Sequence, residues 1–254
     1  MKLIAVFVFL AVASMAGAAT TASNIKPWPR AEMGYYIEPE FPAELRERIH
    51  AAVAQINAVH IVTLTEINDQ QLPAWGREFS SFTYKANKSV CSSGYGWEYE
   101  QNNMIRISDD CTTGTIVHEI LHALGFMHEQ VNPHRTMDLI LDRIQGYIED
   151  QSSNANAVAL TEYDPDSIMH YSSFATSICN YLEDSKWEMP LARLPDRSCR
   201  VDGWEKLTAA NNNGKDCHQE CAVFITKEGK YVSGQRVGLS PLDIEGLRQL
   251  YGVK

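Results

Sequence analysis

The first long periodic segment of the chain covers residues 41–59, FPAELRERIHAAVAQINAV. Its apolar residues recur three or four positions apart: Leu45, Ile49, Ala52, Val53 and Ile56. Charged residues stand between them, as in the run ELRER at 44–48. This spacing predicts an amphipathic helix with one face in the core and the other in solvent.

Three shorter segments follow this helix, at 61–67 (IVTLTEI), 80–85 (SSFTYK) and 103–107 (NMIRI). Their β-branched and aromatic residues favour strands. Helical spacing then returns in TTGTIVHEILHALG, which ends at Gly125, a residue that commonly terminates helices. A second buried helix is therefore predicted just before Gly125.

The C-terminal segment SPLDIEGLRQLYG carries the most complete set of helix signals in the chain. Ser240 is placed to cap the first turn, and Pro241 stands at the first helical position. Asp243 fits the capping box, and Gly252 follows the end. No repeat or linker divides the chain, so we expect one unit with two lobes.

The first eighteen residues have the form of a secretory signal peptide: Lys2, an apolar run, and small residues with Ala16 and Ala18 placed for cleavage. Residues 1–18 are therefore expected to be removed, which leaves 19–254 as a secreted, extracellular chain. No segment approaches the roughly 20 apolar residues of a membrane helix, so no membrane partner is expected. The net charge of −10 also disfavours nucleic acid as the main partner.

Secretion also affects the interpretation of the six cysteines, because an oxidising compartment favours disulfides, and three pairs are expected. Four cysteines lie in the segment 172–232, which has little periodicity and is predicted to be irregular: Cys179, Cys199, Cys217 and Cys221. A zinc site built on Cys217 and Cys221 is the alternative, which secretion disfavours. The sequon that begins at Asn87 is a candidate glycosylation site.

The densest group of titratable residues is HEILHALGFMHE at 118–129. His118 and His122 lie one helical turn apart, so both imidazoles face the same side and can bind one metal ion. Glu119 is rotated about 100° around the helix axis from His118, which places its carboxylate beside that ion. Gly125 lets the chain leave the helix and return, so that His128 can approach as a third ligand. The full pattern HExxHxxGxxH fixes five positions and is far more specific than HExxH alone.

Three neutral nitrogen ligands favour zinc, and one ion is expected. A water polarised by zinc can reach a pKa of about 7. Glu119 is then placed to take a proton from that water as it attacks a peptide carbonyl, and to deliver it to the leaving amine. The sequence therefore predicts hydrolysis of peptide bonds in protein or peptide substrates.

HEILHALGFMHEQ resembles the astacin family of metzincin zinc metalloendopeptidases, and SIMHY at 167–171 resembles that family's Met-turn. The resemblance implies that Met169 forms an apolar floor under the metal. It also implies that Tyr171 is a switchable metal ligand that swings away to stabilise the oxyanion. The similarity extends over nearly the whole mature chain, from KPWPRAEMGYYI to the C-terminal helix. A secreted, monomeric zinc endopeptidase is therefore expected.

By the same resemblance the fold is α+β, a zincin-like catalytic domain of two lobes. The upper lobe is expected to contain a twisted mixed sheet and two long helices, and the lower lobe to be irregular and to end in the C-terminal helix. Zinc would lie between the lobes, with 103–107 as the edge strand that pairs with an extended substrate. The resemblance also implies a disulfide between Cys91 and Cys111, which leaves three alternative pairings for the other four cysteines.

The resemblance also implies a role for Glu129. In the family, a newly cleaved N-terminus is buried against the glutamate that follows the third histidine. Only nine residues separate residue 18 from Trp28, and none is an aspartate that could cap the zinc, so no latency segment is expected. We therefore predict that signal cleavage itself brings the Ala19 ammonium to Glu129. The alternative is a frayed segment at 19–26 and a Glu129 that is only a surface charge.

Two other classes of function stay open at the level of the sequence. One is a catalytically inactive astacin-like scaffold that binds proteins through its cysteine-rich segment, which the intact Glu119 and Tyr171 disfavour. The other is a non-proteolytic structural metal protein, which Gly125, His128 and the Met-turn disfavour.

Overall fold

The computed structural model of the chain describes residues 19–76, 78–86, 88–97, 103–139, 154–171, 199–201, 205–207, 224–225 and 234–253. The predicted signal peptide, the sequon residue Asn87 and the cysteines at 179, 217 and 221 lie outside these residues. None of the helices in the described part of the chain has the length and apolar character needed to span a membrane.

A five-stranded mixed sheet forms the first part of the fold, with the strand order β3-β2-β4-β6-β5. Its strands are β2 (Glu32–Ile37), β3 (Thr63–Glu66), β4 (Phe79–Tyr84), β5 (Ser92–Ser93) and β6 (Asn103–Ile107). Four of them run parallel to one another, and β5 is antiparallel to β6. The strands predicted at 61–67, 80–85 and 103–107 are all present, because their apolar residues face the core.

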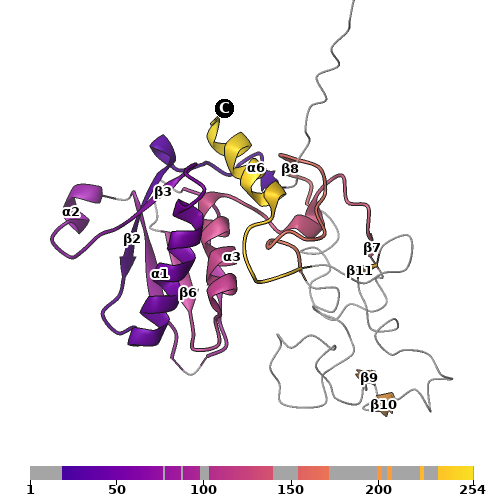
Figure 1. Cartoon of the computed structure of the whole chain (residues 1–254), viewed down its shortest axis with the longest axis horizontal. Helices are drawn as coiled ribbons and strands as arrows, with labels where there is room; N and C mark the ends of the chain where they lie inside the picture. Colours follow the sequence, from indigo (N-terminus) through magenta and orange to yellow (C-terminus); the bar gives the residue numbers. More distant parts are fainter. Residues whose placement is uncertain are drawn as a thin grey trace, which may run out of the picture.

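Two long helices, α1 (Ala43–Asn57) and α3 (Thr113–Leu124), lie side by side against the sheet (Figure 1). The apolar residues predicted to face the core from α1 are all buried. Nearly every residue of α3 is buried, because this helix contacts α1, β5 and β6 as well as Trp28. The Nε1 of Trp28 donates to the Ala123 carbonyl at 2.6 Å. The helix that carries the histidine motif is therefore a core element.

The edge of the sheet differs from the prediction. The expectation that β6 is the edge strand is wrong at Ile105 and Arg106, which pair with Ser93 and Ser92 of β5. Because the β6 backbone is already paired there, a substrate strand that extends the sheet at this point would meet β5 instead. A two-residue strand of serines has no hydrophobic alternation from which it could be predicted.

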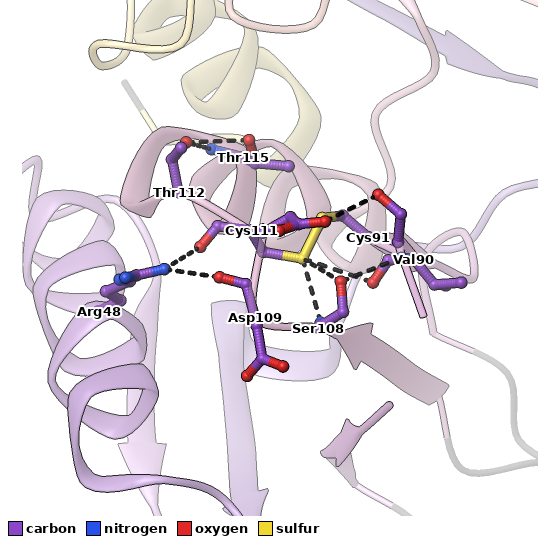
Figure 2. Close-up of a disulfide and its surroundings, with 10 residues drawn as sticks. Arg48, Val90, Cys91, Ser108, Asp109, Cys111, Thr112 and Thr115 are labelled. Atoms are coloured by element: carbon purple, nitrogen blue, oxygen red, sulfur yellow. Dashed lines mark hydrogen bonds between the residues drawn. A yellow bond between two sulfur atoms is a disulfide. The ribbon is translucent and has the colours of Figure 1, made fainter. Parts of the chain in front are cut away.

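Cys91 and Cys111 form a disulfide between the start of the β5 segment and the turn before α3 (Figure 2). Arg48 on α1 reaches the same turn and donates to the carbonyls of Asp109 at 3.0 Å and Cys111 at 3.1 Å. Thr112 caps α3, since its hydroxyl accepts a backbone N–H of the first turn at 3.2 Å. The start of α3 is thereby tied both to α1 and to the edge of the sheet.

Within the described residues, three antiparallel pairs of short strands lie outside the main sheet. They are β1 (Thr20–Ala22) with β8 (Ala157–Ala159), β7 (Asp138–Leu139) with β11 (Phe224–Ile225), and β9 (Cys199–Val201) with β10 (Glu205–Leu207). The described chain also contains short helical turns: η1 (Pro29–Ala31), α2 (Leu72–Trp75) and η2 (Glu129–Val131). A regular sheet-and-helix part followed by an irregular part is the α+β architecture that was predicted.

Helix α6 (Pro241–Tyr251) is the last element and has the predicted capping box. The Ser240 hydroxyl accepts from the Asp243 N–H at 2.9 Å, and the Asp243 carboxylate accepts from the Ser240 N–H at 2.8 Å. Gly246 lies directly against Ala19, because a Cβ at Gly246 would come within 2.1 Å of the Ala19 side chain. The C-terminal helix therefore packs on the N-terminal end of the described chain.

Candidate metal centre and catalytic site

Helix α3 carries His118 and His122 one turn apart, and both side chains are buried. The helix ends at Gly125, whose φ of 112° is a conformation that a glycine adopts without steric cost. The Gly125 N–H donates to the His122 carbonyl at 2.9 Å and closes the last turn. The chain then turns back and brings His128 to the other two imidazoles.

The three imidazoles converge on one position. The ring nitrogens that they can offer to a metal all lie within 4.8 Å of one another, and the Nε2 atoms of His122 and His128 are 3.1 Å apart. The ring centroids of His118 and His128 each lie 4.6 Å from that of His122. Three ligand atoms at this spacing surround a point that one metal ion can occupy.

Backbone carbonyls orient two of these rings. The Nδ1 of His118 donates to the Ile168 carbonyl at 2.8 Å, and the Nδ1 of His122 donates to the Phe126 carbonyl at 2.8 Å. A carbonyl oxygen can only accept, so Nδ1 carries the proton in both rings and Nε2 keeps its lone pair for a metal. The Met-turn and the chain after α3 therefore select the tautomer that a metal needs.

Burial also keeps the three histidines neutral. It lowers the pKa of His122 to about 4 and lowers the pKa values of His118 and His128 well below 6.5, because a charged imidazole loses its hydration here. Neutral imidazole is the form that binds a metal. Three neutral nitrogens, two of them with their outer N–H groups already satisfied, are a donor set that fits zinc.

Three further residues of the predicted site lie on the same helix as these histidines or on the Met-turn: Glu119, Met169 and Tyr171. Glu119 follows His118 on α3 and is almost completely buried. The partly exposed ring of Tyr171 lies 4.4 Å from the ring of His128, measured between centroids. Met169 is buried, and its carbonyl accepts the Glu129 N–H at 3.1 Å. The Met-turn is thereby joined to the segment that follows the third histidine.

Glu129 is completely buried, and its carboxylate accepts three hydrogen bonds. Thr20 Oγ1 donates at 2.8 Å, the Asn132 amide at 2.8 Å and the Asp164 N–H at 3.1 Å. Burial raises the pKa of Glu129 to about 8, because desolvation of the charged carboxylate outweighs the three bonds. The alternative in which Glu129 is a surface charge is therefore wrong. Its carboxylate joins the N-terminal strand to the loop after the third histidine.

Several side chains that support the site have no signal in the sequence motifs. Asp243 accepts from the Ser167 hydroxyl at 2.6 Å and from the Ile168 N–H at 3.1 Å. Arg236 donates to the carbonyls of Ile168 at 2.7 Å and His170 at 3.2 Å. The Met-turn backbone is thus held by α6 and by the segment before it. Only the capping role of Asp243 could be predicted, because its contact with Ile168 joins residues 75 positions apart.

Comparison with known proteins identifies relatives that are zinc peptidases. The family model for Astacin, a family of peptidases, matches residues 20–184. Tolloid-like protein 1 of Mus musculus is 29% identical over 161 residues, which cover 60% of this chain and 15% of that protein. Flavastacin of Elizabethkingia meningoseptica is 30% identical over 122 residues, which cover 48% of this chain and 27% of that protein. The match therefore spans only a small part of these longer relatives.

A solved structure shows the same fold. High choriolytic enzyme 1, a hatching enzyme zinc-protease from Oryzias latipes, has a TM-score of 0.62 with this chain at 21% sequence identity. The similarity covers 91% of this chain and 94% of that chain. Since the family model also covers more than half of the sequence, the chain belongs to the astacin family of zinc metalloendopeptidases.

Proposed function

We propose that this chain is a secreted zinc metalloendopeptidase that hydrolyses peptide bonds of protein or peptide substrates. The observation that carries the proposal is the convergence of His118, His122 and His128. All three rings are neutral, and backbone carbonyls orient two of them. The buried Glu119 follows His118 on the same helix. A structural zinc site is normally closed by four protein ligands. The cluster in the described part of the chain offers three histidines, which suits a site that leaves a position for water and substrate.

A single zinc ion held by the three imidazoles would supply a Lewis acid that polarises the scissile carbonyl and acidifies a water molecule. Glu119 is the general base: its carboxylate takes a proton from the attacking water and delivers it to the leaving amine. The Tyr171 hydroxyl donates a hydrogen bond to the oxyanion as charge develops there. Met169 contributes an apolar floor. Tyr171 is partly exposed beside His128, which suits a side chain that has to move.

We propose the following organisation of the chain. Residues 1–18 form a signal peptide, and 19–254 form one peptidase domain with a lower-lobe insertion at about 172–232. Two disulfides in that insertion join Cys179, Cys199, Cys217 and Cys221. The disulfide between Cys91 and Cys111 supports export, because disulfides persist in oxidising compartments. We expect a monomer that carries one zinc ion and a glycan at Asn87, and that binds neither membranes nor nucleic acid.

We further propose that Glu129 anchors a mature N-terminus at Ala19. Ala19 is buried, and the hydroxyl of the next residue, Thr20, donates to the Glu129 carboxylate. A free ammonium at Ala19 would lie one residue away from that bond. Its charge would offset the cost of burying the ionised carboxylate, because a buried charge is tolerated when a partner of opposite charge is near.

Hydrolysis of labelled casein by the secreted protein tests the activity. Glu119→Gln keeps the shape of the side chain but cannot take a proton, so we expect the rate to fall by a factor of about 100 to 10,000 with zinc still bound. Chelation should abolish hydrolysis, and added zinc should restore it. Glu245→Gln, on the partly exposed side of α6, is the matched control and should keep wild-type activity.

Two results would contradict the proposal. Hydrolysis that neither Glu119→Gln nor the chelator reduces would exclude this mechanism. A wild-type protein that binds zinc and hydrolyses neither casein nor a peptide library would instead be the inactive scaffold.

A further inference from the structure

Side chains hold the peptide groups of Tyr171 on both sides. The Tyr171 N–H donates to Oε1 of Gln130 at 3.1 Å, and the Tyr171 carbonyl accepts from Nδ1 of His170 at 2.5 Å. Gln130 and His170 are both completely buried, the first in η2 after the third histidine and the second in the Met-turn. Tyr171 lies in no helix or strand, so its position depends on such side-chain contacts.

The His170 ring is itself fixed by a second hydrogen bond. Because the Tyr171 carbonyl can only accept, Nδ1 of His170 carries the proton, and Nε2 accepts from the Tyr163 hydroxyl at 2.6 Å. Tyr163 is buried together with Met137, and the partly buried Tyr171 side chain packs against this pair. A continuous chain of contacts therefore leads from the Tyr163 hydroxyl through His170 to the Tyr171 main chain.

This arrangement restrains the main chain of Tyr171. Its two peptide groups are tied to buried side chains, and its ring is partly exposed. The hydroxyl lies at the far end of a long side chain, so a small rotation of the peptide would displace it considerably. A donor that stabilises an oxyanion is most effective when its position is set before the reaction.

We propose that Gln130, His170 and Tyr163 are positioning residues that hold the Tyr171 peptide so that its phenol moves along one path between the metal ligands and the oxyanion. This inference rests on the catalytic role proposed above for Tyr171. It assigns a function to the Tyr163 hydroxyl, which acts on the reaction only through His170 and Tyr171.

Steady-state kinetics of Tyr163→Phe test this role. The substrate is a quenched fluorescent peptide selected by library profiling. The variant loses one hydroxyl and keeps the ring. We expect kcat to fall about 10-fold or more, while KM and zinc content stay at wild-type values, because misplacing a catalytic group slows the chemical step. The matched control is Tyr251→Phe, which also removes one tyrosine hydroxyl; that hydroxyl is partly buried and donates to the Leu124 carbonyl at 2.9 Å. Equal losses of kcat in the two variants would overturn the proposal.

The double variant Tyr163→Phe/Tyr171→Phe separates the two roles. If Tyr163 acts through Tyr171, adding Tyr163→Phe to Tyr171→Phe should lower kcat no further. Losses that multiply would overturn the positioning role. If Tyr171→Phe alone leaves kcat unchanged, the catalytic role of Tyr171 fails, and the positioning role that rests on it fails as well. A loss in Tyr171→Phe with none in Tyr163→Phe contradicts the positioning role alone.

Crystal structures of the zinc-free protein supply a readout that does not depend on activity. In the wild type we expect one position for the His170 ring and for the Tyr171 main chain. In Tyr163→Phe and in Gln130→Met, each of which removes one contact, we expect Tyr171 to be displaced or to occupy several positions. Unchanged positions of Tyr171 in both variants would overturn the proposal.

Discussion

The Asp243 carboxylate forms hydrogen bonds with both the start of α6 and the Met-turn. One oxygen accepts from the N–H groups of Ser240 and Ile168, and the other accepts from the Ser167 hydroxyl, so the group that caps α6 also holds the Met-turn. Burial raises its pKa from 3.8 to about 6, because desolvation disfavours the charged form more than the hydrogen bonds favour it. The folded protein therefore retains a proton over a pH range in which the unfolded chain has lost it.

This pKa shift predicts a pH dependence of stability. Since the folded state binds the extra proton between about pH 4 and pH 6, the free energy of unfolding should fall through that window by about 3 kcal/mol from this group and stay reduced above it. Asp243→Asn has nearly the same shape and does not titrate, so this fall should be missing. Urea unfolding at pH 4, 5, 6 and 7 measures the difference, with the exposed Asp69→Asn as control. Equal pH slopes in wild type and Asp243→Asn would contradict the prediction.

At the scale of elements, the end of α3 determines where the third histidine lies. Gly125 has a φ of 112°, and a Cβ there would lie 3.2 Å from Ile25 and 3.3 Å from Leu250. Gly125→Ala should therefore lower the free energy of unfolding by about 1–2 kcal/mol or more and weaken zinc binding, because His128 is displaced. Gly76→Ala is the matched control, since Gly76 also has a positive φ of 59° but has open space around it. It should lower stability and leave zinc affinity unchanged, measured by chelator competition.

Elements with a strong local pattern could be predicted from the sequence, whereas those formed by distant contacts could not. The buried face of α1 and the capping box of α6 follow from spacing and from Ser240 and Asp243, and both are confirmed. The strands β1 and β5 are only three and two residues long and carry no alternation, so pairing partners alone define them. The contact of Gln130 with Tyr171 joins residues 41 positions apart. Sequence motifs thus identified the candidate ligands but not the side chains that orient them.

In the whole molecule, the N-terminal strand β1 connects parts that are distant in the sequence. Thr20 donates to Glu129, and Thr21 donates to the Gly125 carbonyl at 2.7 Å, so two neighbouring hydroxyls contact the two segments that flank His128. The strand also pairs with β8, and Ala19 lies against α6. Residues 19–22 are all buried, which is the opposite of a frayed end.

If residues 1–18 are the proposed signal peptide, the secreted protein should begin at Ala19, as N-terminal sequencing would report. Deletion of 19–22 should lower the free energy of unfolding by about 3 kcal/mol or more, because the buried Glu129 carboxylate and the Gly125 carbonyl each lose a donor. Thr20→Val should show part of this loss, and Thr20→Ser, which keeps the hydroxyl, should show little of it. A start well away from Ala19 would contradict the proposed anchor. Undiminished stability after the deletion would contradict the bridging role of β1.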